Sequence, residues 1–193
     1  WSLSRLIKSN QQNQFNSEEE AFSALETTLL KSVKSQMVSD VPLGIFLSGG
    51  IDSSLIASLA QDCTNEPIKT FTIGFDNSSF DESPFAQRVA EHLKTTHSKI
   101  NVTEDDALNL IPKLALIYDE PFSDSSQIPT YFVCKSAKNH VSVALSGDGA
   151  DELFGGYNRY ISSKAIWKKV SWIPRFVRVG IGWCILHIPT TFI

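Results

Sequence analysis

Short apolar runs and stretches with helical spacing alternate along this chain. The run Ile45–Leu47 is apolar throughout, as in a strand buried on both faces, and it stops at Ser48-Gly49-Gly50. Apolar residues then recur at helical spacing, and Asp52 and Ser53 are residue types that cap helix N-termini. The stretch therefore predicts a buried strand, a glycine turn and a helix in direct succession.

The same alternation continues on both sides of this unit. It predicts strands at 70–75, 97–102 and 141–145, and helices at 17–40, 83–94, 104–117 and 129–138. Ser17 opens the first helix with a capping box, and Ser83 is the expected N-cap of the second. We expect the core side of these two helices to hold Phe22, Leu25, Leu29 and Val33, and then Phe85, Val89, Ala90 and Leu93. The alternation predicts an α/β fold with an open, mainly parallel sheet and helices on both faces, followed by a helical C-terminal part.

The glycine turn has the composition of an anion site. Glycines let a phosphate approach the backbone, and a helix N-terminus directs N–H groups and partial positive charge at it. No lysine follows these glycines as in a Walker A loop; Ser48, Ser53 and Ser54 offer hydroxyls and Asp52 a carboxylate. A carboxylate beside phosphates suits a bridging Mg²⁺. The turn therefore indicates the pyrophosphate loop of an ATP pyrophosphatase rather than an ordinary strand-to-helix connection.

A second strand also ends in a Ser-Gly turn. The apolar strand 141–145 leads into Ser146-Gly147, and the acids Asp148, Asp151 and Glu152 follow within a few positions. In open α/β sheets ligands bind at the carboxyl ends of strands, so both turns are expected to face one crevice, with Asp52 and Asp151 near one metal. Clustered acids repel one another unless a cation compensates them.

Composition and charge place limits on the function. The 193 residues are 42% hydrophobic and 20% charged, and neither a signal peptide nor an apolar run of membrane-spanning length is visible. Cys63, Cys134 and Cys184 are far apart and lack metal spacing, so we interpret them as reduced packing residues of a cytoplasmic protein. The net charge of −4 divides into −10 for residues 1–152 and +6 for the acid-free remainder. That basic segment indicates a helical part of a larger fold, and contact with nucleic acid or anionic lipid is the weaker alternative.

The two turns, in this order, resemble the synthetase domain of glutamine-dependent asparagine synthetase, within the ATP pyrophosphatase superfamily. The matching segments are 42–54, 70–75, 119–121 and 143–160, and residues 1–3 are similar to the link after the family's glutaminase domain. The resemblance implies an adenine nucleotide alpha-hydrolase-like fold. It also implies that 1–16 is a linker after an absent glutaminase domain, and that 17–193 is the N-terminal portion of the synthetase domain, with a truncated C-terminal part.

The resemblance also implies a reaction and its residues. In the family, the aspartate side chain attacks the α-phosphorus of ATP, which gives β-aspartyl-AMP and pyrophosphate, and ammonia from glutamine then displaces AMP. The matching ATP-binding positions are Phe46, Leu47, Ser48, Gly49, Gly50, Asp52, Ser53, Ile73, Ser146 and Gly147. Asp52 and Asp151 match the Mg²⁺ ligands, and Asp148 matches a catalytic acidic residue. For Phe46 and Leu47 core packing is an equal alternative, and Glu120 and Asp124 either border the substrate site or are solvated loop acids.

Two departures from the family leave alternatives open. The glutaminase domain and its cysteine nucleophile are absent, and Lys164, Lys168 and Lys169 lack the Lys-x-Asp context of the family's catalytic lysine. An amidotransferase for another carboxylate would carry much the same motifs. A tRNA-modifying pyrophosphatase or a non-catalytic nucleotide module accounts less well for the second turn. We expect ATP, aspartate and ammonia or glutamine as partners, no nucleic acid and no membrane, and we leave a homodimer open.

Overall fold

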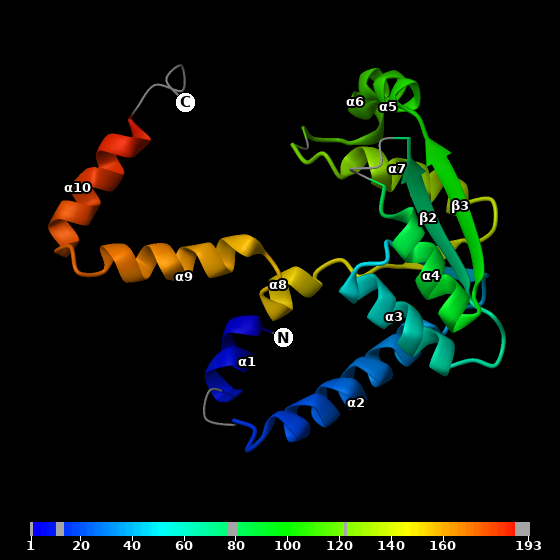
Figure 1. The fold of residues 1–193 in the computed structure, drawn as a ribbon, viewed down its shortest axis with the longest axis horizontal. Coiled ribbons are helices and arrows are strands. Elements are labelled where there is room, and N and C mark those ends of the chain that lie inside the picture. The colour runs from blue at the N-terminus through cyan, green and yellow to red at the C-terminus, as the bar shows by residue number, and fades with distance from the viewer. Residues whose placement is uncertain (1, 11–13, 77–80, 122, 188–193) are drawn as a thin grey trace. The chain divides into compact units, whose positions relative to one another are not determined.

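A computed structural model describes residues 2–10, 14–76, 81–121 and 123–187 (Figure 1). Its contacts divide the chain into two compact units, residues 1–147 and 148–193, and each is described by itself. The segment expected to be a linker contains a short helix, α1 (Leu3–Asn10).

The described strands form one parallel sheet in the order β3-β2-β1-β4. These are β1 (Leu43–Phe46), β2 (Lys69–Phe75), β3 (Thr96–Val102) and β4 (Val143–Leu145). Strand β1 lies between β2 and β4, with Ile45 opposite Thr70 and Leu145. Every pairing is parallel, which confirms the predicted α/β class. The central position of β1 puts the glycine turn that follows it at the middle of the sheet's carboxyl edge.

Helices α2 (Glu18–Gln36), α3 (Ile51–Asp62) and α4 (Ser83–Leu93) cover one face of this sheet (Figure 1). Ile45 and Leu47 point to this face, because side chains alternate along a strand. They pack against the small residues Ala57, Ala60 and Ala86, which let the helices approach closely.

The other face is covered mainly by α7 (Gln127–Ala137). Phe71 packs there against Ala137 and Val141. Toward β3, Phe132 of α7 forms a cluster with Val102 and Leu110. The helices therefore lie on both faces of the sheet, as predicted.

Two predicted helix starts are displaced by one or two residues. Helix α3 has Gly50 as its N-cap, so Asp52 and Ser53 lie in its first turn rather than at the cap. Helix α4 has Glu82 as N-cap, and Ser83 is already helical. The physical reason is local: Asp81 accepts hydrogen bonds from the Ser83 N–H and hydroxyl at 3.0 and 2.6 Å, which turns the chain before Ser83.

Three predicted core residues are exposed. Phe22 and Leu25 on α2 are 66% and 36% exposed and Phe85 on α4 is 53% exposed, whereas Val33 and Ala90 are buried as expected. A helix of 19 residues is about 28 Å long, so α2 extends well beyond the short strand β1 that its last turns cover. Its first turns therefore have no sheet to pack against.

The helix predicted at 104–117 is broken in the structure. It forms α5 (Glu104–Leu110), the 3₁₀ turn η1 (Ile111–Lys113) and α6 (Leu114–Ile117). Pro112 has no N–H for a helical hydrogen bond and its ring clashes with the preceding turn, which explains the break.

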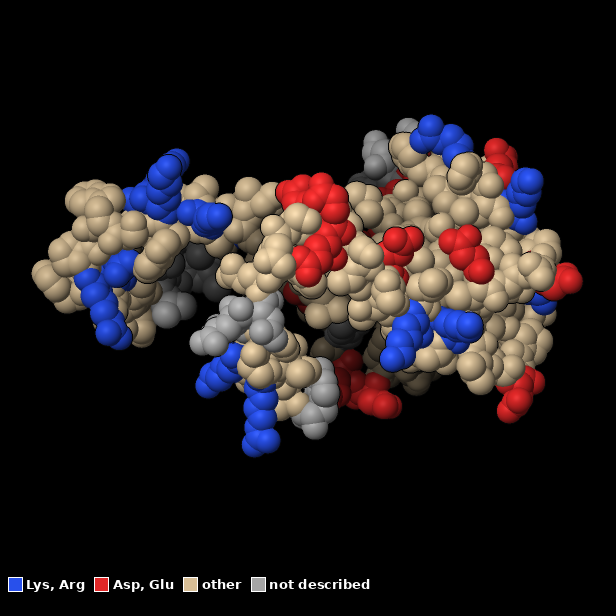
Figure 2. All heavy atoms as spheres, turned by 90° about the horizontal axis from the view of Figure 1, so that it is seen from below, with Lys and Arg blue, Asp and Glu red and all other residues tan. Residues whose placement is uncertain are grey.

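The second unit is helical, as predicted. It contains α8 (Ala150–Phe154), α9 (Asn158–Val170) and α10 (Arg175–Leu186). Figure 2 shows Lys and Arg side chains, with no acidic side chain among them, on the surface that α9 and α10 form. Trp167, Trp172 and Phe176 are also exposed there. In the part of the chain that the structure describes, no helix combines the length and apolarity needed to cross a membrane.

The cysteine prediction is right about the oxidation state and partly wrong about the packing. All three cysteines are free thiols. Cys63 is half-buried, but Cys134 and Cys184 are exposed and fill no core position.

Candidate functional site

The glycine loop joins the end of β1 to the start of α3. The Leu47 N–H donates to Phe71 O at 2.9 Å, so the sheet pairing continues one residue past β1 before the chain turns. Gly49 has a φ of +83°, a conformation that favours glycine. A Cβ on Gly49 would lie 2.5 Å from the Ala86 nitrogen, so the start of α4 packs directly on the loop. The loop is therefore held on one side by β1 and on the other by α4.

Two serine hydroxyls hold the loop in shape. The oxygens Ser48 Oγ and Ser53 Oγ are 2.9 Å apart, and the Ser48 N–H donates to Ser53 Oγ at 3.2 Å. The Gly50 N–H donates to Ser48 Oγ at 3.2 Å. Ser53 is buried, at 8% exposure. These hydroxyls therefore bond first to the loop itself, and a bound phosphate would have to share them.

Helix α3 begins without a side-chain cap. Its N-cap is Gly50, which has no side chain to accept from the first N–H groups of the helix. These groups and the positive end of the helix dipole favour an anion at the carboxyl edge of the sheet. Asp52 is half-buried in the same first turn.

The second Ser-Gly turn lies against this helix start. A Cβ on Gly147 would be 2.8 Å from the Ser53 nitrogen and 3.1 Å from Asp52 Cβ, so only glycine allows the close approach. The expected meeting of the two turns is therefore observed within the first unit. Parallel pairing of β4 with β1 is the cause, because it brings their carboxyl ends side by side.

The acidic residues that follow the second Ser-Gly turn, Asp148, Asp151 and Glu152, belong to the second unit. Asp151 is the second residue of the short helix α8, and its carbonyl accepts the N–H of Gly155 at 2.9 Å and of Gly156 at 3.1 Å. A Cβ on Gly156 would overlap the Asp151 carboxylate. This helix end fixes the Asp151 side chain tightly against its own turn.

Glu152 in this turn already has a partner. Its carboxylate accepts a 2.6 Å hydrogen bond from the Tyr157 hydroxyl, and Arg159 stacks on the Tyr157 ring at 4.1 Å. The hydrogen bond to Glu152 raises the pKa of Tyr157 to about 12 and lowers that of Glu152. Glu152 is thus hydrogen-bonded within the second unit, and the described residues hold no group of three or more His, Cys, Asp or Glu arranged for metal binding. A metal shared by Asp52 and Asp151 stays a prediction.

Comparison with known proteins identifies the family. The model of the asparagine synthase family matches residues 24–189. The chain belongs to the asparagine synthase family. It is 44% identical to glutamine-hydrolyzing asparagine synthetase 1 of Bacillus subtilis, over 74% of this chain and 22% of that protein. It is 34% identical to asparagine synthetase B of Escherichia coli, over 69% of this chain and 26% of that protein. The chain thus spans about a quarter of the length of these relatives.

A solved structure with the same fold is NMN synthetase from Francisella tularensis. The TM-score is 0.50 at 19% identity, over 70% of this chain and 58% of the other. This likeness supports the predicted fold class and nothing more specific.

The residues in or next to β1 and β2 that match ATP-binding positions of the asparagine synthase family lie mainly in the core of this chain. Leu47 is 1% exposed and packs in the cluster under α2, α3 and α4, so its side chain serves the core. Phe46 is half-buried against Phe71 and lines a groove along β4, and Ile73 is half-buried beside Val102. Of the two interpretations left open for Phe46 and Leu47, the burial of Leu47 favours packing for that residue.

The loop acids have local roles. Asp124 is exposed, and its carboxylate accepts the Ser126 N–H at 2.8 Å just before α7, which lowers its pKa. Glu120 is exposed in the same loop. Both side chains are therefore accessible to solvent, and neither lines the two cavities described for residues 46–144.

The sequence analysis missed the side chains that α4 places beside the loop. Arg88 and His92 line a cavity together with Gly49, Ser54 and Ser58. Nothing in their local pattern distinguishes them from ordinary polar residues on a helix surface. Only the packing of α4 on Gly49 brings them to the loop.

Proposed function

We propose that this chain is the ATP-binding portion of an asparagine synthetase. In this proposal the enzyme activates the side-chain carboxylate of aspartate as β-aspartyl-AMP, releases pyrophosphate, and forms asparagine with ammonia from glutamine. The glutaminase domain would be part of the whole protein. The observation that carries the proposal is the match to the asparagine synthase family over most of the chain, combined with the uncapped helix start at the glycine loop.

The geometry of the loop supports a pyrophosphate site. Helix α3 has a glycine N-cap, and Gly147 lies against the same turn, so a phosphate would meet backbone donors from both Ser-Gly turns. Ser48 and Ser53 would keep the loop in this conformation. Ile73, Ser146 and the backbone near Phe46 and Leu47 would border the adenosine.

The donor chemistry also fits Mg²⁺. In this proposal, Asp52 in the first turn of α3 and Asp151 on α8 would supply the carboxylate oxygens that Mg²⁺ prefers. The bound ion would neutralise charge on the phosphates as the leaving group departs. Asp148 would act on the reacting groups, as its match to the family's catalytic acidic position implies.

The test is an activity assay on a protein that contains this chain with its glutaminase domain. Aspartate, glutamate and other carboxylates are supplied separately with ATP, Mg²⁺ and either glutamine or ammonium, and asparagine and AMP are measured by mass spectrometry. We expect asparagine and AMP from aspartate with both nitrogen sources. If AMP forms only with another carboxylate, that carboxylate rather than aspartate is the substrate. An absence of AMP with every carboxylate would contradict the proposal.

The Asp52→Asn variant tests the metal assignment in the same assay. It preserves size and hydrogen bonding but removes the charge, so turnover should fall at least ~10–100-fold, as is typical when the support of a metal site is lost. Asp148→Asn should lower turnover with little change in melting temperature, and Asp148→Glu should retain more activity. Wild-type pyrophosphate release by Asp52→Asn would contradict the metal role.

A further inference from the structure

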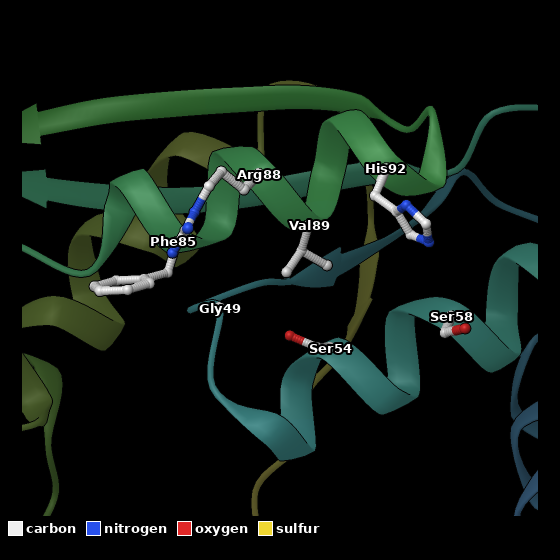
Figure 3. A pocket seen from close by; sticks show the side chains of 7 residues that line it. All are labelled: Gly49, Ser54, Ser58, Phe85, Arg88, Val89 and His92. Carbon is white, nitrogen blue, oxygen red and sulfur yellow. The ribbon is translucent and has the colours of Figure 1, made fainter.

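A cavity of about 420 Å³ lies between α3 and α4 next to the glycine loop (Figure 3). Its volume is in the range of ligand pockets. All of its lining residues belong to the first unit: Gly49 of the loop, Ser54 and Ser58 of α3, and Phe85, Arg88, Val89 and His92 of α4. In Figure 3, Val89 points from α4 toward Ser54, and His92 extends from α4 on the side of Ser58.

The position of Arg88 follows from the docking of α4 on the loop. A Cβ on Gly49 would lie 2.6 Å from Phe85 Cβ, so the first turn of α4 touches the loop. Arg88 follows one turn later, and its guanidinium stacks on the Phe85 ring at 5.0 Å. With the described residues Arg88 forms no ion pair. Its charge is therefore held beside the loop without a carboxylate to neutralise it.

Ser54 presents an unused donor to the same cavity. Its N–H donates to Gly50 O at 3.1 Å as part of the helix, but its hydroxyl is shielded from solvent and has no hydrogen-bond partner among the residues that the structure describes. A shielded hydroxyl without a partner destabilises the fold, and a ligand oxygen that accepts from it would remove this cost.

The lining is chemically suited to an oxyanion. Arg88, His92, Ser54 and Ser58 all carry hydrogen-bond donors, and none of the described residues that line the cavity is acidic. A guanidinium binds phosphate oxygens in a bidentate manner. Phe85 and Val89 make most of the wall apolar, so the donors supply the polar contacts of the cavity. The glycine loop and the first turn of α3, residues 47–54, contain no cationic side chain, so α4 supplies the positive charge next to them.

We propose that this cavity is a binding site for a phosphate anion, either inorganic phosphate or pyrophosphate, with Arg88 as its main cation and Ser54 as a hydroxyl donor. The site differs from the backbone site at the start of α3, because it is built from side chains on the facing sides of α3 and α4. It requires only a folded first unit and does not depend on asparagine synthesis.

The test is a titration of the 193-residue chain with sodium phosphate, sodium pyrophosphate and sodium acetate, followed by calorimetry at low ionic strength. Arg88→Gln is compared with the matched control Arg159→Gln, which removes the same charge from an arginine that also stacks on an aromatic ring, but in the second unit. We expect Arg88→Gln to bind phosphate or pyrophosphate at least about tenfold more weakly, as for loss of one charge-assisted hydrogen bond. Arg159→Gln should bind like the wild type.

Ser54→Ala separates ligand binding from folding. Because the hydroxyl has no partner in the fold, its removal should leave the melting temperature unchanged or raise it, while phosphate affinity falls several-fold. If Arg88→Gln proves unstable, Arg88→Lys replaces it in the titration. This variant keeps the charge but loses the bidentate guanidinium, so it should retain only part of the phosphate affinity.

Three results would overturn the proposal. These are equal affinities of Arg88→Gln and Arg159→Gln, wild-type binding by Ser54→Ala, and acetate binding as tight as phosphate binding. A higher pyrophosphate affinity of Asp52→Asn, which removes a carboxylate from the start of α3, together with unchanged affinity of Arg88→Gln, would locate the anion at the glycine loop instead. A failure of the asparagine assay leaves this titration unaffected, so the two proposals fail separately.

Discussion

The same substitution should destabilise the fold much more at Gly49 than at its neighbour Gly50. Gly49 has a φ of +83° and its Cβ would meet the Ala86 nitrogen at 2.5 Å. Gly50 has a φ of −69°, and the nearest atom to its Cβ is Ser48 Oγ at 3.3 Å. Alanine at Gly49 is therefore strained and crowded by backbone, whereas alanine at Gly50 meets only a side-chain hydroxyl.

The expected magnitude for Gly49→Ala follows from two costs. A left-handed alanine costs about 1–2 kcal/mol, and crowding of a packed site typically costs about 1–3 kcal/mol. The free energy of unfolding should therefore fall by about 2–5 kcal/mol. For a chain of this size the melting temperature should drop by about 4–20 °C, at roughly 2–4 °C per kcal/mol. Gly50→Ala replaces a glycine N-cap with a poorer one and should cost about 1 kcal/mol or less.

Urea unfolding followed by circular dichroism measures both variants against the wild type. Equal slopes with denaturant concentration are the control, because a changed slope would indicate a different unfolded state rather than a strained loop. Similar midpoints for Gly49→Ala and Gly50→Ala would refute the reasoning. They would mean that α4 does not pack on the loop, and the position of Arg88 beside the loop would lose its support as well.

Two further predictions concern titrating groups. The hydrogen bond from the Ser83 hydroxyl lowers the pKa of Asp81, and Lys99 is 3.9 Å away, so the charged carboxylate stabilises the start of α4. A carboxyl whose pKa is lowered in the folded state stabilises the protein above its unfolded-state pKa, and this stabilisation is lost as the pH falls through the folded-state pKa. Asp81→Asn should therefore lower the melting temperature at neutral pH and progressively less in acid. A melting-temperature difference between variant and wild type that does not change with pH would contradict this. Because Glu152 raises the pKa of Tyr157 to about 12, Glu152→Gln should move this pKa down toward the ordinary value of about 10 in an ultraviolet phenolate titration, and no movement would contradict the pairing.

The local sequence determined most of the secondary structure. β-Branched and aromatic residues at 70–75, and apolar residues at 45–47, predict strands because the preferences of side chains for extended backbone act within a few residues. Glycine positions were informative for the same reason, since a turn with positive φ at Gly49 is a local requirement. The α/β class followed from the order of the elements, and the parallel sheet confirms it.

Tertiary packing decided which of the predicted faces are buried and which side chains meet. Helical spacing marks Phe22 and Phe85 as core residues just as it marks Val33, but only the length of the sheet and the docking of α4 determine that the two phenylalanines are exposed. The contact of Gly147 with the start of α3 depends on β4 pairing with β1, two strands about a hundred residues apart in sequence. The unpartnered Ser54 hydroxyl and the charge of Arg88 likewise come together only because two helices pack on the same face of the sheet. Burial and contacts between distant segments are properties of the whole fold, so no local pattern of residues encodes them.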